Sequence, residues 1–322
     1  MTVKLLLDNL TNPALLFFVL GIISVRIKSD LEIPSDASKF ISLYLLFSIG
    51  FKGGQELAKS QLSPEVLYSI ILGVATAIII PIYTFFILKK KLNVEDSGAI
   101  AAAYGSVSAV TFVTAGVFLE NLHIQYGGHM VAIMAMMEAP AIIVGVLLIR
   151  YFSKQQEKYS TNINQVIYHS FTNGSVLLIL GSLLIGYLAT EKQALDIKPF
   201  TTDIYKGFLA IFLLDMGITS GRKLNDLFKA GWFTAFFAII IPLFNGCVIA
   251  FVSGFVTDNI GNRFILSILA ASASYIAVPA AMKIAVPKAN PGLFLPMALA
   301  LTFPFNITIG FPIYMTLIQH FK

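Results

Sequence analysis

The chain has few charged residues for its length. Only 12% of its 322 residues are Asp, Glu, Lys or Arg, whereas a water-soluble protein has roughly a quarter of its residues charged. Hydrophobic residues make up 57% of the sequence, which is more apolar surface than a soluble fold of this length can cover. The scarcity of charge therefore excludes an ordinary soluble domain and predicts a protein whose main solvent is lipid.

Other features that carry chemistry are also missing. The one cysteine, Cys247, lies in an apolar run, so neither an intramolecular disulfide nor a CxxC motif can form. The four histidines lack metal-binding spacing, and there is no P-loop, GxSxG or dinucleotide-binding motif between a strand and a helix. We therefore expect no enzyme activity, no transition metal and no organic cofactor. The net charge of +5 comes from short clusters between apolar runs, so no nucleic-acid partner is expected.

What the sequence has is a succession of apolar runs, each long enough to cross a bilayer core of about 30 Å as a helix. They predict an all-α polytopic membrane protein with ten transmembrane helices. The expected helices cover residues 12–27, 39–57, 64–88, 96–119, 129–152, 165–190, 204–224, 227–256, 263–285 and 291–321.

The positive charges predict the orientation of these helices. The loops after helices 1, 3, 5, 7 and 9 and the adjoining helix ends hold 14 of the 22 Lys and Arg residues. Because positive residues are retained on the cytoplasmic side during insertion, both termini are expected outside.

The two halves of the chain resemble each other. Four patches recur in the same order at offsets of 161 to 168 residues: 49–57 with 216–224, 78–81 with 239–242, 105–111 with 273–279, and Pro140 with Pro304. Any one match can arise by chance in an apolar sequence, but four in order favour a duplication. An odd number of helices per copy inverts the second copy. The predicted domains are a first five-helix repeat, 1–152, a cytoplasmic linker, 153–164, and a second, inverted repeat, 165–322.

Helices 4 and 9 have unusual centres, rich in Gly, Ala, Ser and Thr, and Pro279 interrupts the second of them. Such segments favour helix breaks, and two half-helix N-termini that meet inside the membrane would bind a small anion through their amides and dipoles. Close packing through small residues is the alternative. The residues expected to bind the substrate are Gly105, Ser106, Val107, Ser108, Ala273, Ser274, Tyr275 and Ile276.

Two acidic residues lie within predicted spans, where a charge is costly and often functional. Glu138 precedes Pro140, which frees a backbone carbonyl, so Glu138 is a candidate ligand for Na⁺ or a proton carrier. Asp215 in helix 7 is an equal candidate for function or for a structural hydrogen bond. Hydroxyl and amide oxygens also suit Na⁺, although polar contacts between helices explain them equally well. The expected Na⁺ ligands are Ser108, Thr111, Glu138, Thr302 and Asn306.

Motifs along nearly the whole chain resemble the sodium-dependent bicarbonate transporters first associated with cyanobacteria. They are NPALLFFVLG (12–21), IGFKGGQEL (49–57), YGSVSAVTF (104–112), MEAPAII (137–143), NGSVLLILGSLLIG (173–186), LLDMGI (213–218) and the segment 270–292. The resemblance implies ten helices in a 5+5 inverted repeat, a core domain moving against a gate domain, a homotrimer, and bicarbonate held with Na⁺ where helices 4 and 9 cross. Ser106, Ser108, Thr111 and Ser274 fall on matching motif positions.

The chain also departs from the cyanobacterial pattern. Tyr275 replaces an acid in helix 9, and Glu138 replaces an aspartate. The central linker is much shorter, so the PII-like regulatory partner of the cyanobacterial proteins is not carried over. We interpret the chain as a relative from a heterotrophic bacterium, with several spans in the inner membrane.

The sequence thus predicts a secondary transporter that carries bicarbonate or a similar small anion with Na⁺ by an elevator-like alternating-access mechanism. A Na⁺- or H⁺-coupled carrier of another small organic anion is the nearest alternative, since Tyr275 replaces the acid. A membrane sensor that does not transport is a third hypothesis.

Overall fold

A computed structural model describes residues 11–59, 63–153, 166–168, 172–229 and 231–321. These residues form helices joined by short connections, and no strand occurs among them. The all-helical architecture expected from the sequence is therefore confirmed.

The first half of the chain contains α2 (Pro13–Arg26), α3 (Ser35–Lys59), α4 (Pro64–Leu88), α5 (Val94–Gly105), α6 (Ala109–Asn121) and α7 (His129–Phe152). The second half contains α9 (Gly174–Leu188), α10 (Glu191–Lys198), η2 (Pro199–Asp203), α11 (Tyr205–Lys229), α12 (Trp232–Val252), η3 (Ser253–Phe255), α13 (Ile260–Ala271), α14 (Ala277–Ala285), α15 (Pro291–Pro296), η4 (Met297–Thr302), α16 (Phe303–Phe305), η5 (Asn306–Gly310) and α17 (Phe311–His320).

Six helical segments of the described chain are long and apolar enough to cross a membrane, and α2, α9 and α13 are shorter apolar helices. The protein is therefore a multi-pass membrane protein. The six segments are Pro64–Leu88, Val94–Asn121, His129–Phe152, Glu191–Leu224, Trp232–Phe255 and Pro291–His320.

Several boundaries differ from the prediction. The helix expected over 165–190 is shorter, because α9 begins only at Gly174, where Asn173 caps its first turn. The break expected between 224 and 227 lies further along the chain, since α11 continues to Lys229 and α12 begins at Trp232. The sequence also missed α10, although Thr190 and Gln193 form a capping box that marks its start.

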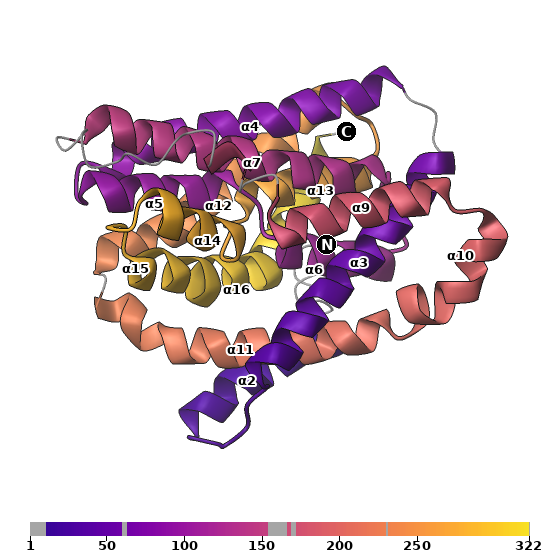
Figure 1. Cartoon of the computed structure of the whole chain (residues 1–322), viewed down its shortest axis with the longest axis horizontal. Coiled ribbons are helices and arrows are strands. Elements are labelled where there is room, and N and C mark those ends of the chain that lie inside the picture. The colour runs from indigo at the N-terminus through magenta and orange to yellow at the C-terminus, as the bar shows by residue number, and fades with distance from the viewer. Residues whose placement is uncertain (1–10, 60–62, 154–165, 169–171, 230, 322) are drawn as a thin grey trace.

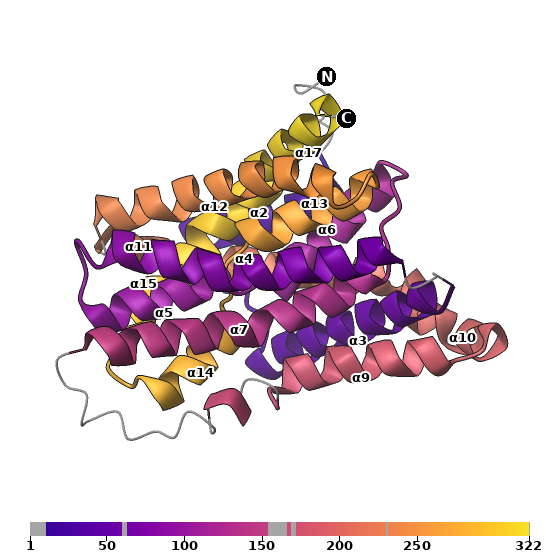
Figure 2. The same ribbon diagram turned by 90° about the horizontal axis from the view of Figure 1, so that it is seen from above.

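Two pairs of helices pack closely through small residues. The helices α2 and α11 cross at Gly217, where a Cβ atom would lie 2.0 Å from the Phe18 carbonyl oxygen. The helices α3 and α9 cross in the same way at Gly54, where a Cβ atom would lie 2.0 Å from the Leu183 carbonyl oxygen. Figure 1 shows α2 against α11, and Figures 1 and 2 both show α3 beside α9. Only glycine permits such backbone contact, which is a common basis for helix association in membranes.

The remaining long helices form a second group. Here α4 packs against α5 and α7, and α12 packs against α13 and α17. The half-helices α5, α6 and α13 are almost fully buried inside this group, whereas α4 and α12 expose apolar side chains along their outer faces. This burial places the two interrupted segments at the centre of the protein (Figure 1).

Candidate functional site

The first break lies between α5 and α6. The helix α5 ends at Gly105, Ser106 takes an extended conformation, and Ser108 caps the start of α6 by accepting a hydrogen bond from the Thr111 amide at 3.1 Å. A Cβ atom on Gly105 would lie 2.1 Å from the Pro81 ring. Gly105 therefore allows α5 to end against α4, and the predicted interruption of this helix is confirmed.

The second break lies between α13 and α14. The helix α13 ends at Ala271, residues 272–276 form a non-helical connection, and α14 begins at Ala277. Pro279 lies in the first turn of α14, where its missing amide hydrogen costs nothing because first-turn amides lack helical partners. The proline thus favours the start of a new half-helix, and the predicted interruption of helix 9 is also confirmed.

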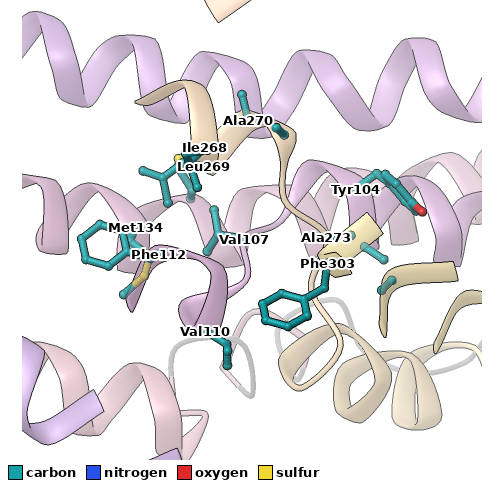
Figure 3. Packing of buried hydrophobic residues seen from close by; sticks show 14 of the residues in the cluster. Tyr104, Val107, Val110, Phe112, Met134, Ile268, Leu269, Ala270, Ala273 and Phe303 are labelled. Carbon is teal, nitrogen blue, oxygen red and sulfur yellow. The ribbon is translucent and has the colours of Figure 1, made fainter. Parts of the chain in front are cut away.

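The two breaks cross and are bonded to each other. The Ser108 amide donates to the Ser272 hydroxyl at 3.0 Å, and the Ser274 amide donates to the Ala103 carbonyl at 2.8 Å. Figure 3 shows Val107 between Met134 and Ala273 at this crossing. Cross-bonding of this kind satisfies backbone groups that leave the helix inside the protein, as a membrane interior requires.

A small cavity of about 30 Å³ lies beside the crossing. Residues from both breaks line it, and α3, α7 and α9 complete its wall. This volume has room for a few atoms. The lining residues are Leu46, Val107, Ser108, Ala109, Met134, Ala135, Glu138, Ser175, Ile179, Ser274, Tyr275 and Ile276.

The starts of both half-helices contribute to the lining of this cavity, through Ser108 and Ala109 at α6 and through Tyr275 and Ile276 before α14. The first amides of a helix lack acceptors within the helix. Each helix N-terminus carries about half a positive charge from its aligned peptide dipoles. Two such ends in one cavity, with no Lys, Arg or His in its lining, favour a small anion.

Two hydroxyl groups at the breaks lack hydrogen-bond partners among the described residues. The Tyr275 hydroxyl is buried beside that of Ser108, without a hydrogen bond of good geometry. The Ser106 hydroxyl is fully buried and also unpaired. An unpaired buried hydroxyl costs free energy unless something binds to it. Tyr275 lines the cavity, whereas Ser106 lies behind its lining.

Glu138 is the one acidic residue in the lining of the small cavity. Its side chain on α7 makes no hydrogen bond or ion pair with any residue in the described ranges. Two residues further along, Pro140 cannot donate to the Met136 carbonyl, which leaves that oxygen without its helical partner. An unpaired carboxylate that shares a cavity with Ser108, Ser175 and Ser274 is a suitable environment for a hard cation such as Na⁺.

Ser108 lines the cavity together with Glu138, whereas the other predicted Na⁺ ligands, Thr111, Thr302 and Asn306, are not in its lining. Thr302 accepts from the Tyr104 hydroxyl at 2.7 Å and donates to the Ala238 carbonyl at 2.7 Å. Asn306 donates to the Ala271 carbonyl at 2.7 Å. These bonds hold the ends of α5 and α13 beside the crossing, so both residues position the half-helices. Their role as Na⁺ ligands, and that of buried Thr111, stays a prediction.

The remaining substrate-site candidates and Asp215 lie outside this lining. Gly105 and Ala273 are buried residues that lie at the two breaks. Asp215 on α11 accepts a hydrogen bond from the Ser38 hydroxyl of α3 at 2.5 Å. This hydrogen bond agrees with the structural alternative that the sequence analysis gave for Asp215.

Besides Ala109 at the start of α6, five lining residues were not expected from the sequence, and these five come from helices other than 4 and 9. They are Leu46 on α3, Met134 and Ala135 on α7, and Ser175 and Ile179 on α9. Ser175 is the polar member of this set; it lies two residues after the helix-capping Asn173, and no local signal placed it at the cavity. Within the described residues there is no cluster of three or more His, Cys, Asp or Glu side chains suited to a metal ion.

One comparison with known proteins identifies the family of the chain. The family model described as "Na+-dependent bicarbonate transporter superfamily" matches residues 13–319, nearly the whole chain. A search of curated proteins found no match.

Proposed function

The chain belongs to the Na⁺-dependent bicarbonate transporter superfamily, and from this premise we propose that it carries bicarbonate together with Na⁺ through the cavity at the crossed helix breaks. The observation that carries the proposal is that two half-helix N-termini and the unpaired Glu138 carboxylate share one small cavity. Amides and hydroxyls of the breaks bind the anion, and Glu138 with nearby oxygen atoms binds Na⁺.

The charges in the cavity give a physical reason for coupling the two ions. Two helix N-termini contribute about one positive charge, which Glu138 offsets. If bicarbonate bound alone, one negative charge would be uncompensated. At 5 Å and an effective dielectric constant of 20, two charges interact by about 3 kcal/mol, which is roughly a hundredfold in affinity. Na⁺ at Glu138 therefore favours bicarbonate binding, and bicarbonate favours Na⁺ binding to the same degree.

We further propose that the transporter is a 5+5 inverted repeat, in which α2, α3, α9 and α11 form the gate and the other helices form the core. Repeated packing supports this proposal. Gly217 approaches the Phe18 carbonyl, and Gly50 approaches the Ile179 carbonyl in the equivalent pair. Asn12 and Asn173 also cap α2 and α9 in the same way, each accepting from the amide two residues later.

An elevator-like movement of the core past the gate is the proposed route of alternating access, since the cavity lies between the two groups. Leu46, Ser175 and Ile179 line it from the gate, and the two breaks with Glu138 line it from the core. We place the protein in the inner membrane of a bacterium as a homotrimer, as the family resemblance implies.

Uptake into proteoliposomes tests the function directly. Labelled bicarbonate should accumulate above its equilibrium level when an inward Na⁺ gradient is imposed, and only equilibrate when K⁺ replaces Na⁺. If uptake does not depend on the Na⁺ gradient, the proposed coupling to Na⁺ is wrong. Accumulation driven equally well by an inward H⁺ gradient would favour Glu138 as a proton carrier instead.

Tyr275→Phe should weaken bicarbonate transport without unfolding the protein. The substitution removes a hydroxyl that has no partner among the described residues, so the thermal unfolding temperature should not fall. A hydrogen bond to a charged group contributes about 1.5–3 kcal/mol, so the KM for bicarbonate should rise roughly tenfold or more. An unchanged KM with a stable protein would exclude Tyr275 from the anion site.

A second candidate function is the transport of another small organic anion, which Tyr275 favours because it adds a neutral donor where the cyanobacterial pattern has an acid. The small cavity limits such a substrate to a few heavy atoms. Competition by formate, acetate and other short carboxylates against labelled bicarbonate tests this alternative. If none of them displaces bicarbonate, the alternative fails.

A further inference from the structure

The protein has a second and much larger cavity, which we call the basin. Its volume is about 750 Å³, and its wall comes from the C-terminal part of α3, the α6 helix, the following loop and the segment from α10 to the start of α11. The distribution of positive charge in the sequence predicts that this side of the protein faces outward. None of the residues predicted to bind substrate or Na⁺ lines it.

The basin is lined by charges of both signs, but some of them are already paired with each other or with neighbouring residues. Its charged and titratable side chains, tyrosines aside, are Lys52, Glu56, Lys59, Glu120, His123, Glu191 and Lys198. Glu56 pairs with Lys59 at 3.7 Å, and Glu120 pairs with Lys206 at 3.4 Å. Two of the three acids are thus neutralised.

Among the lysines that line the basin, Lys52 is the least exposed to solvent. Its ammonium lies 5.5 Å from the centre of the Tyr205 ring, and it makes no ion pair or hydrogen bond with any described residue. Lys198 is also unpaired among these residues, but it lies on the surface helix α10. An unpaired cation over an aromatic ring in the wall of a cavity is a suitable anchor for an anion.

The floor of the basin lies close to the small cavity. Three helices contribute to both spaces with residues one turn apart: Ile49 and Leu46 on α3, Val113 and Ala109 on α6, and Val131 and Ala135 on α7. One turn is about 5.4 Å along a helix axis. Ile49, Val113 and Val131 are almost fully buried, so an apolar layer about one turn thick separates the two spaces.

We propose that the basin is a second anion site, in which Lys52 binds bicarbonate or a similar small oxyanion before it passes the apolar layer of Ile49, Val113 and Val131. This inference rests on the proposed function and deepens it, because it adds a binding step before the small cavity. Lys52 concentrates the anion near the floor and does not contact it at the helix breaks. Its loss should therefore change the apparent affinity more than the turnover.

The test compares Lys52→Gln with Lys59→Gln in the full chain, using labelled bicarbonate and a fixed Na⁺ gradient in proteoliposomes. Lys52→Gln should raise the KM for bicarbonate roughly three- to tenfold and leave kcat within a factor of two. Lys59→Gln is the matched control, because its ammonium is exposed and already paired with Glu56. Its KM should stay within a factor of two of the wild type.

Two further measurements separate charge from packing. Lys52→Arg should restore the wild-type KM, since it keeps the cation. Increasing ionic strength with an impermeant salt should lower wild-type uptake at low bicarbonate, and should lower that of Lys52→Gln less, because screening acts on the attraction that the variant lacks.

The outcomes distinguish this proposal from the proposed function. If wild-type protein carries no bicarbonate, the proposed function fails and the basin proposal fails with it. If wild-type protein transports normally but Lys52→Gln has an unchanged KM and salt dependence, only the basin proposal is overturned. A KM that rises equally in Lys52→Gln and Lys52→Arg would show a packing role for Lys52 and would also overturn it.

Discussion

Glu138→Gln should abolish Na⁺-driven accumulation of bicarbonate. The substitution keeps the shape and oxygen of the side chain but removes the one carboxylate in the small cavity. Na⁺ then lacks its charged ligand, and we expect its affinity to fall roughly a hundredfold, as the interaction of two charges at about 5 Å predicts. The measurement is the ratio of internal to external labelled bicarbonate under an inward Na⁺ gradient, which should approach equilibrium.

The same substitution should leave bicarbonate less dependent on Na⁺ for binding. Without the carboxylate, the two helix N-termini balance the anion directly, so residual uptake should be the same in Na⁺ and in K⁺. Asp215→Asn is the matched control, since Asp215 is also an acid within a helix but already accepts a hydrogen bond from Ser38. It should keep its Na⁺ dependence. Normal accumulation by Glu138→Gln would contradict the assignment.

Gly217→Val should prevent the close packing of α2 on α11. Its Cβ atom would lie 2.0 Å from the Phe18 carbonyl oxygen and 3.1 Å from the Gly21 Cα atom, and backbone atoms cannot move aside as a flexible side chain would. The helices must separate, at a cost of about 3 kcal/mol or more. We expect the thermal unfolding temperature of the purified protein in detergent to fall by about 10 °C, or folded protein not to be recovered.

Gly207→Val on the same helix is the control for this prediction. No heavy atom lies within 4 Å of a Cβ atom at Gly207, so the substitution should change the unfolding temperature by no more than a few degrees. Gly54→Val should behave like Gly217→Val, because Gly54 makes the equivalent contact between α3 and α9. A stable Gly217→Val protein would show that this crossing is not needed for the fold.

The all-helical, membrane-spanning character of the fold could be predicted because lipid imposes strong constraints on a sequence. Length and apolarity marked the long spans, and Gly, Ser and Pro marked the breaks near Gly105 and Pro279. The helix ends near Lys229 and Trp232 were misplaced, because the polar residues there continue α11 instead of ending it. The short α10 was missed because its sequence, EKQALDIK, contains no apolar run.

The candidate site was predicted in its chemistry but not in its full composition. Ser108, Ser274 and Glu138 do share a cavity, since each had a local signal in its own segment. Ser175 reaches the same cavity from α9, and no local pattern reveals which side chains a distant helix contributes. The helix 10 residues Thr302 and Asn306 carried a polar signal, but their bonds to Ala238 and Ala271 depend on tertiary packing that the sequence does not specify.

The most direct test of the central claim is the affinity of the purified protein for Na⁺, measured by equilibrium binding of ²²Na⁺ with and without saturating bicarbonate. We expect bicarbonate to lower the Kd for Na⁺ at least tenfold in the wild type, and Glu138→Gln to remove this effect. A Kd for Na⁺ that is the same with and without bicarbonate, or that Glu138→Gln leaves unchanged, would contradict the claim that both ions bind together at the crossed helix breaks.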